Sequence, residues 1–297
     1  MVGTQHLHSL AKVSEYCIFS AHPLNNLFVR ASFSVITSNS CAASLPALSS
    51  LLSLELTMNK DSTLQFALDT SWDTACDSYR NGCLSDDDLE CVAKYDAREG
   101  ILYAGTSSTD LVAGTTATVA ALSLDEDNVI SQLVVLNCGD SRTLVVGEPM
   151  DGKRHYVRFK TRDHSPSCPK EGKRLRANPN HSDPQCSMNK FWLTVGDYRY
   201  AVSRSLEGPL PTSKGITSES DIFLVNLADV ASTTTYGMII QASDGLFEVL
   251  DNEEVGREAV DMRKKGLSAT DCAHYLCDLA KKKGTSDNVT VTIVYLE

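Results

Sequence analysis

The chain has 297 residues, 42% of them hydrophobic, and a formal net charge of -11. This length permits one large domain or two small ones. The negative charge argues against binding nucleic acid or an anionic membrane surface through bulk electrostatics. Ten scattered cysteines without zinc-ligand spacing are typical of free thiols in a reducing compartment. No apolar run approaches the ~18–20 residues of a membrane span. We therefore expect an intracellular monomer, cytoplasmic or nuclear, with organelle import as the alternative suggested by the Ser-rich stretch 31–54.

The first ~60 residues are poor in charge and only weakly periodic, unlike the rest of the chain. The sequence predicts a short helix over 44–56 and a better defined one over 62–80, where apolar residues recur at helical spacing. A third is predicted over 85–98, which opens with a serine and acids suited to a helix N-terminus. We expect residues 1–43 to form an atypical N-terminal segment and residues 44–297 the domain proper.

After residue 113 the pattern is that of short strands and hairpins. Residues 114–124 are small and β-branched, and residues 131–148 form two apolar runs separated by a Gly-Asp turn signal. Alternating segments follow at 155–166 and at the C-terminus. Helices are predicted over 251–265 and 268–283, which begin with acidic or capping residues and end with bases. Helices that segregate from antiparallel strands predict an α+β layered domain.

Three acidic residues, Asp140, Asp244 and Asp287, lie at abrupt strand ends beside Gly, Ser or Asn. Such acids often simply make turns. Acids are depleted from strands, however, and burying one unpaired is costly. If the three strand ends converge, the carboxylates form a hard-oxygen site suited to Mg²⁺ or Mn²⁺.

Six segments, in order, resemble the motifs of the PP2C family of metal-dependent serine/threonine protein phosphatases. They are "GTTATVAAL", "LNCGDSRTLVV", "TRDHSPSCPKEGKRL", "YAVSRSLEG", "ASDGLFEVLDNEEV" and "GTSDNVTVTIV". Together they cover about residues 105–297. The resemblance implies an αββα sandwich, in which two antiparallel sheets stack face to face between helix pairs and metals bind at one edge.

By the same resemblance, Asp244 and Asp287 ligate one catalytic metal, and Asp140 belongs to a third metal that is held more weakly. The partner of Asp140 at that third metal is Glu248, a longer carboxylate than the family's usual Asp, and the extra methylene changes its reach. The cofactor implied is Mg²⁺ or Mn²⁺, two ions in the family. The resemblance assigns no catalytic residue in this chain.

The N-terminal part departs from the family, because the chain contains no Asp-Gly-His. In the family this Asp bridges the two catalytic metals, and an earlier Arg binds the phosphate. The nearest similarity is "CIFSAH" at 17–22, either a decayed copy or a chance match. We therefore expect one tight metal site or fewer, and early strands that are incomplete or replaced, with residues 15–19 and 28–36 apolar enough to take their places.

Three interpretations follow. The chain is a phosphatase for phosphoserine and phosphothreonine of a phosphoprotein substrate, with activity that is weak or lost. Alternatively, it is an inactive pseudophosphatase that binds signalling partners as a scaffold. In the third, the first ~40 residues come from an altered transcript. Three further residues receive structural roles: His164 at a turn, and Arg142 and Arg204 as partners of local acids or carbonyls.

Overall fold

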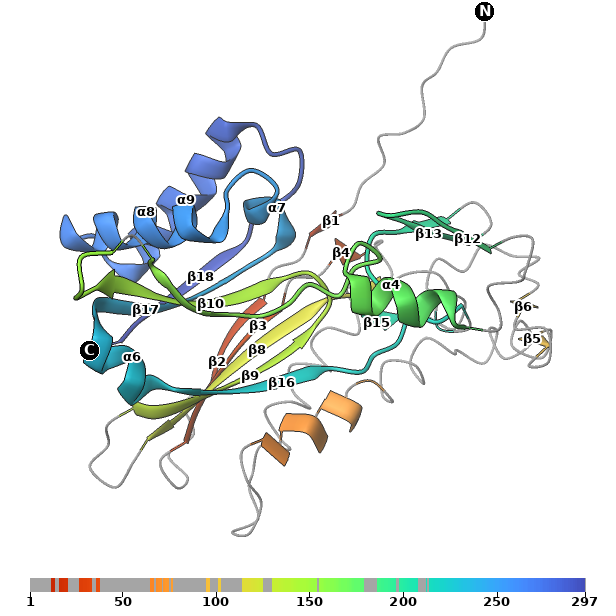
Figure 1. Ribbon diagram of the computed structural model, residues 1–297, viewed down its shortest axis with the longest axis horizontal. Coiled ribbons are helices and arrows are strands. Elements are labelled where there is room, and N and C mark those ends of the chain that lie inside the picture. The colour runs from red at the N-terminus through yellow and green to blue at the C-terminus, as the bar shows by residue number, and fades with distance from the viewer. Residues whose placement is uncertain are drawn as a thin grey trace, which may run out of the picture.

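Figure 1 shows a computed structural model of the chain. It describes residues 114–124, 130–153, 155–178, 186–195, 198–207, 212 and 214–296, together with short strand and helix segments before residue 114. Within these ranges, no helix is long and apolar enough to cross a lipid bilayer.

Two antiparallel sheets form the centre of the molecule (Figure 1). The four-stranded sheet has the order β11-β10-β17-β18, and the five-stranded sheet has the order β16-β9-β8-β3-β2. The strands of the first are β11 Val157–Lys160, β10 Arg142–Pro149, β17 Thr234–Ala242 and β18 Val291–Tyr295. Those of the second are β16 Asp221–Asn226, β9 Ile130–Cys138, β8 Ala117–Leu124, β3 Leu27–Phe33 and β2 Tyr16–Ser20.

Strands β10 and β17 are buried on both faces, which explains their continuous apolar runs. Val145 and Ile239 face the other sheet and pack with Leu133 and Val135 of β9. The alternate residues Leu144 and Ile240 face the helices instead. The four-stranded sheet is therefore a central layer of the sandwich.

Two C-terminal helices cover the outer face of this sheet: α8 Asn252–Lys264 and α9 Ala269–Lys283 (Figure 1). A capping box between Asp251 and Glu254 begins α8, and Ser268 caps α9. Gly284, in the left-handed region at φ 88°, ends α9. Both predicted helices are confirmed.

The opposite layer lies beneath the five-stranded sheet, where helical turns appear between residues 65 and 76 (Figure 1). Leu68 and Trp72 are buried there, and the indole Nε1 of Trp72 donates a hydrogen bond to the Ser218 carbonyl at 2.7 Å. The αββα arrangement expected from the sequence is confirmed, and the helical turns between residues 65 and 76 are the described part of this outer layer.

The apolar segments predicted at 15–19 and 28–36 do take strand places, as β2 and β3. Strand β3 pairs with β8 from Leu27↔Ser123 to Ser32↔Thr118, and β2 pairs with β3. These N-terminal strands thus extend the second sheet. The division of the chain at residue 43 stays a prediction.

The helix predicted over 85–98 is wrong at its C-terminal end. Tyr95–Asp96 form β5, which pairs with β6 Ile101–Leu102. A short connection containing Gly100 favours a hairpin over continued helix. Residues 85–94 and the helix predicted over 44–56 lie outside the described residues.

Shorter elements surround one end of the sandwich. They are β1 Lys12–Val13 with β4 Ile36–Thr37, β7 Gly114–Thr115 with β15 Leu206–Glu207, and the three-stranded sheet of β12 Cys186–Met188, β13 Leu193–Val195 and β14 Tyr198–Tyr200. The described residues also form α4 Pro169–Arg176, α6 Leu227–Thr233 and the single turn α7 Asp244–Phe247. Leu175 of α4 packs on the three-stranded sheet.

Candidate metal centre

The ends of β17 and β18 bring two of the predicted acids together. The strands pair as far as Ala242↔Val291, and the Ser243 amide then donates to the Thr290 carbonyl at 3.1 Å. The buried Ser243 hydroxyl accepts from the Thr290 amide at 3.0 Å and donates to the Asn288 carbonyl at 3.2 Å. These bonds fix the segment before β18 against the start of α7, so Asp287 lies beside Asp244.

Asp244, Glu248 and Asp287 form one carboxylate cluster. Each offers an oxygen, and these oxygens lie within 4.8 Å of one another. Asp244 and Glu248 are four residues apart around the turn of α7 and therefore share a face. Glu248 Oε2 accepts from the Thr285 hydroxyl at 3.2 Å, and Asp287 Oδ1 accepts from the Asn288 amide at 2.7 Å.

The electrostatics of the cluster suit a cation. Burial raises the pKa of Asp244, and the charges of Asp287 and Glu248 raise it further. Like charges held this close are unfavourable without a compensating positive charge. Carboxylate oxygens are the ligands that Mg²⁺ and Mn²⁺ prefer, so the donor set fits such an ion.

Asp140 lies in the turn between β9 and β10, outside that cluster. Gly139 before it has φ +116°, and a Cβ there would come within 2.3 Å of Thr116 Cγ2, so the turn requires glycine. Burial, followed by the charges of Asp244 and Asp163, raises the pKa of Asp140. The negative charge of Asp244 therefore acts on Asp140. Glu248, the predicted partner of Asp140, lies instead in the cluster with Asp244 and Asp287. The pairing of Asp140 with Glu248 at one ion stays a prediction.

Arg142 pairs with a local acid, as expected. Its Nε and Nη2 donate to the two oxygens of Asp163, both at 2.6 Å, and its Nη1 donates to Asn252 Oδ1 at 3.0 Å. The guanidinium also lies over the Phe247 ring, 4.5 Å from the centroid. Arg142 thus joins β10 to the start of α8 beside the candidate site.

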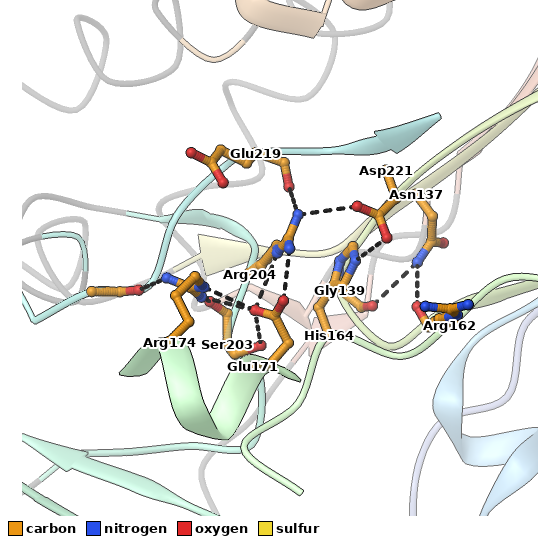
Figure 2. A network of polar contacts seen from close by, with 11 residues as sticks. Asn137, Gly139, Arg162, His164, Glu171, Arg174, Ser203, Arg204, Glu219 and Asp221 are labelled. Atoms are coloured by element: carbon orange, nitrogen blue, oxygen red, sulfur yellow. Dashed lines mark hydrogen bonds and ion pairs between the residues drawn. The ribbon is translucent and has the colours of Figure 1, made fainter. Parts of the chain in front are cut away.

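A second network, shown in Figure 2, centres on the buried carboxylate of Glu171. Arg204 Nη2 donates to Glu171 Oε1 at 2.6 Å, and Arg174 Nη2 donates to Oε2 at 2.9 Å. Burial alone would raise the pKa of Glu171, but the bonds from Arg204 and Arg174 outweigh it and lower the pKa to about 2. Arg204 also reaches Asp221 Oδ1 at 3.2 Å. The predicted role of Arg204 as a partner of local acids is confirmed.

His164, 2% exposed, lies between this network and the Asp140 turn (Figure 2). Its Nδ1 accepts from the Gly139 amide at 3.1 Å, and its Nε2 lies 3.2 Å from Asp221 Oδ2, off the line of a good hydrogen bond. The residue does lie at a turn, as predicted, but its ring makes specific contacts on both sides.

Two residues of the site were not singled out from the sequence: Ser243, which joins the strand ends, and Thr285, which binds Glu248. The sequence did contain a signal for both residues, because each is a small hydroxyl residue close before a predicted acid. Ser243 directly precedes Asp244 in "SD", and Thr285 precedes Asp287 by two positions in "TSD". The side chains of the "CIFSAH" segment lie outside the described ones.

A family model described as "Protein phosphatase 2C" matches residues 57–289. "Protein phosphatase 1B" from Homo sapiens is 25% identical over 161 residues, 54% of this chain and 31% of that protein. A "Protein kinase and PP2C-like domain-containing protein" from Oryza sativa subsp. japonica is 30% identical over 171 residues, 57% of this chain and 23% of that protein. The chain thus matches less than a third of the length of either relative.

Solved structures share the fold. A serine-threonine phosphatase 2C from Toxoplasma gondii has a TM-score of 0.63 at 16% identity, covering 96% of this chain and 94% of that one. A sex determining protein from C. elegans has a TM-score of 0.60 at 18% identity, covering 98% and 66%. At these identities the likeness concerns the fold alone.

Proposed function

The chain belongs to the protein phosphatase 2C family, and from this we propose that it hydrolyses phosphoserine and phosphothreonine esters of proteins in a metal-dependent reaction. The observation that carries the proposal is the cluster of Asp244, Glu248 and Asp287, whose oxygens lie within 4.8 Å of one another. The expected rate is well below that of a complete two-ion site, because the sequence lacks the Asp-Gly-His that supplies the family's bridging acid.

In this proposal, Asp244, Glu248 and Asp287 hold Mg²⁺ or Mn²⁺, and Asp140 helps to hold a second, weaker ion. When bound, such an ion supplies Lewis-acid polarisation of a phosphoryl oxygen and a lowered pKa for water. The chain's own residues set where this happens: Ser243 fixes the two strand ends, and Thr285 orients Glu248. Arg142 donates hydrogen bonds to Asp163 and Asn252, so we assign it a structural role beside the site rather than a role in binding phosphate.

A second candidate function is a pseudophosphatase that binds phosphoproteins or signalling partners without turnover. The missing Asp-Gly-His favours it. In either case we propose a monomer in a reducing, intracellular compartment, cytoplasmic or nuclear. The free thiols of Cys168 and Cys272 support the reducing compartment.

The test is phosphopeptide hydrolysis at millimolar Mn²⁺ by the wild-type chain, Asp244→Asn and the control Asp278→Asn. Asp278 is an exposed acid on α9, outside the cluster. We expect low, Mn²⁺-dependent activity that Asp244→Asn abolishes and Asp278→Asn retains. Calorimetric Mn²⁺ binding without turnover would favour the pseudophosphatase. Absence of Mn²⁺ binding would contradict the phosphatase and leave the pseudophosphatase, which needs no ion to bind a partner.

A further inference from the structure

His164 holds both backbone polar groups of Gly139. The His164 amide donates to the Gly139 carbonyl at 2.9 Å, and the Gly139 amide donates back to His164 Nδ1 at 3.1 Å. Because Nδ1 accepts, the neutral ring carries its proton on Nε2, which faces Asp221. Asn137 Nδ2 adds a second bond to the Gly139 carbonyl at 3.2 Å.

Gly139 in turn determines where Asp140 lies. Its left-handed backbone, at φ +116°, packs so closely on Thr116 that a Cβ would be 2.3 Å from Thr116 Cγ2. The turn therefore has little room to relax around the glycine. A residue that holds both polar groups of Gly139 fixes the direction in which the next residue, Asp140, leaves the turn.

The other side of His164 is anchored in the Glu171 network (Figure 2). Its carbonyl accepts from the Ser203 amide at 2.9 Å, and Asp221, 3.2 Å from Nε2, is bound by Arg204. Arg204 is bound to Glu171 of α4 at 2.6 Å. The imidazole thus joins a rigid, buried ion-pair network to the Asp140 turn.

We propose that His164 is a positioning residue for the metal centre, which holds the Gly139–Asp140 turn so that Asp140 can bind the second, weaker divalent ion. A residue needed only for the turn would require its backbone alone. Here the ring nitrogen supplies the acceptor that fixes Gly139. This inference rests on the proposed function, because it takes Asp140 as a ligand.

The experiment compares His164→Leu, His164→Asn and Asp140→Asn with the wild-type chain. Leucine fills a similar volume but has no acceptor. Asparagine can place its Oδ1 close to the position of Nδ1 and accept from Gly139. Mn²⁺ binding is measured by calorimetry and by paramagnetic resonance of the free ion, and exchange of the Gly139 amide is measured in metal-free protein.

We expect one tight and one weak Mn²⁺ site in the wild-type chain, and loss of the weak site in Asp140→Asn. His164→Leu should weaken the weak site about 10–100-fold, as loss of a residue that supports a ligand does, and leave the tight site unchanged. The Gly139 amide should exchange faster in His164→Leu. His164→Asn should restore both readouts most of the way to the wild-type values.

Wild-type affinity at the weak site in His164→Leu would overturn the inference, as would an Asp140→Asn variant that binds Mn²⁺ like the wild type. In both cases the tight site, and with it the proposed metal-dependent hydrolysis, would stand. An unchanged tight site in Asp244→Asn would instead overturn the proposed function. If His164→Leu fails to fold, His164→Asn decides: loss of the weak site in that variant contradicts the inference.

Discussion

Gly245 and Asn288 touch backbone to backbone: a Cβ on residue 245 would lie 2.3 Å from the Asn288 carbonyl oxygen. The contact brings the turn of α7 onto the segment before β18, and it places the acids on either side, Asp244 and Asp287, in one cluster. The Asp-Gly pair is thus explained by close approach, since Gly245 is not among the glycines with positive φ.

Gly245→Ala should therefore separate the two acids. The added methyl meets backbone rather than a flexible side chain, so the segments must move apart, at a cost of about 1–3 kcal/mol. We expect a lower thermal midpoint and weaker Mn²⁺ binding by calorimetry. Gly237→Ala is the matched control, because its Cβ would meet Leu296 at an ordinary 3.6 Å. Equal Mn²⁺ affinity in Gly245→Ala and the wild type would show that the close contact does not determine the spacing of Asp244 and Asp287.

Glu171 should make stability depend on pH in the acid range. Because the pKa of Glu171 falls from 4.5 to about 2 in the folded chain, its stabilisation is fully present above pH 4.5. That contribution, on the order of 3 kcal/mol, is lost as the pH falls through about 2. Urea unfolding between pH 2 and pH 5 should show this slope in the wild-type chain.

Glu171→Gln should flatten the dependence of stability on pH. It should also lower the free energy of unfolding at pH 7 by about 3–5 kcal/mol, because the buried Arg204 loses the charge of its closer carboxylate and keeps only the longer contact with Asp221. Glu219→Gln is the control, since the hydrogen bond that Glu219 makes with Arg204 comes from its backbone carbonyl and is kept in this variant. A slope in Glu171→Gln as steep as in the wild-type chain would mean that other carboxylates dominate acid unfolding.

Much of the sandwich could be predicted, because its signals are local. The runs around the Gly-Asp turn at 139–140 became β9 and β10, and the capped segments became α8 and α9. The hairpin at Tyr95–Leu102 could not be predicted, because pairing between strands outweighed a weak helical pattern.

The acids of the site could be identified from the sequence, but which of them lie together in one cluster could not be predicted. Asp244 and Asp287 stand out as acids at the ends of apolar strands, whereas their meeting depends on the register of β17 with β18. The place of Glu248 depends on the rotation of one helical turn and on the hydroxyl of Thr285. Such contacts between distant residues leave no periodic signal in the sequence.

Mn²⁺ should stabilise the folded chain through this cluster. In the metal-free chain, burial and then the repulsion from Asp287 and Glu248 raise the pKa of Asp244, and both oppose folding at neutral pH; a bound cation compensates them. Each tenfold rise in Mn²⁺ above its dissociation constant should add about 1.4 kcal/mol, seen as a rising thermal midpoint. The effect should shrink at lower pH, where protons compete for Asp244. Asp287→Asn should lose most of the Mn²⁺-dependent rise in thermal midpoint, and Asp278→Asn should keep all of it. A rise in Asp287→Asn as large as in the wild-type chain would mean that the ion binds elsewhere.

Thr285 offers a test of how neighbouring groups orient the carboxylates of the cluster. The hydroxyl donates to Glu248 Oε2 at 3.2 Å and accepts from the Asp287 amide at 3.4 Å, and valine removes both bonds while keeping the shape of the side chain. Because Glu248 would lose the group that orients it, Thr285→Val should weaken Mn²⁺ binding at the tight site about 10-fold by calorimetry. The thermal midpoint of the metal-free protein should change little, since the bond to Glu248 is exposed to solvent and the contact with the Asp287 amide is long, at 3.4 Å. Thr233→Val removes an exposed hydroxyl bond to the Asp229 backbone carbonyl, far from the cluster in sequence, and should leave Mn²⁺ binding unchanged. If Thr285→Val binds Mn²⁺ as tightly as the wild type while Glu248→Gln does not, Glu248 reaches the ion without help from Thr285.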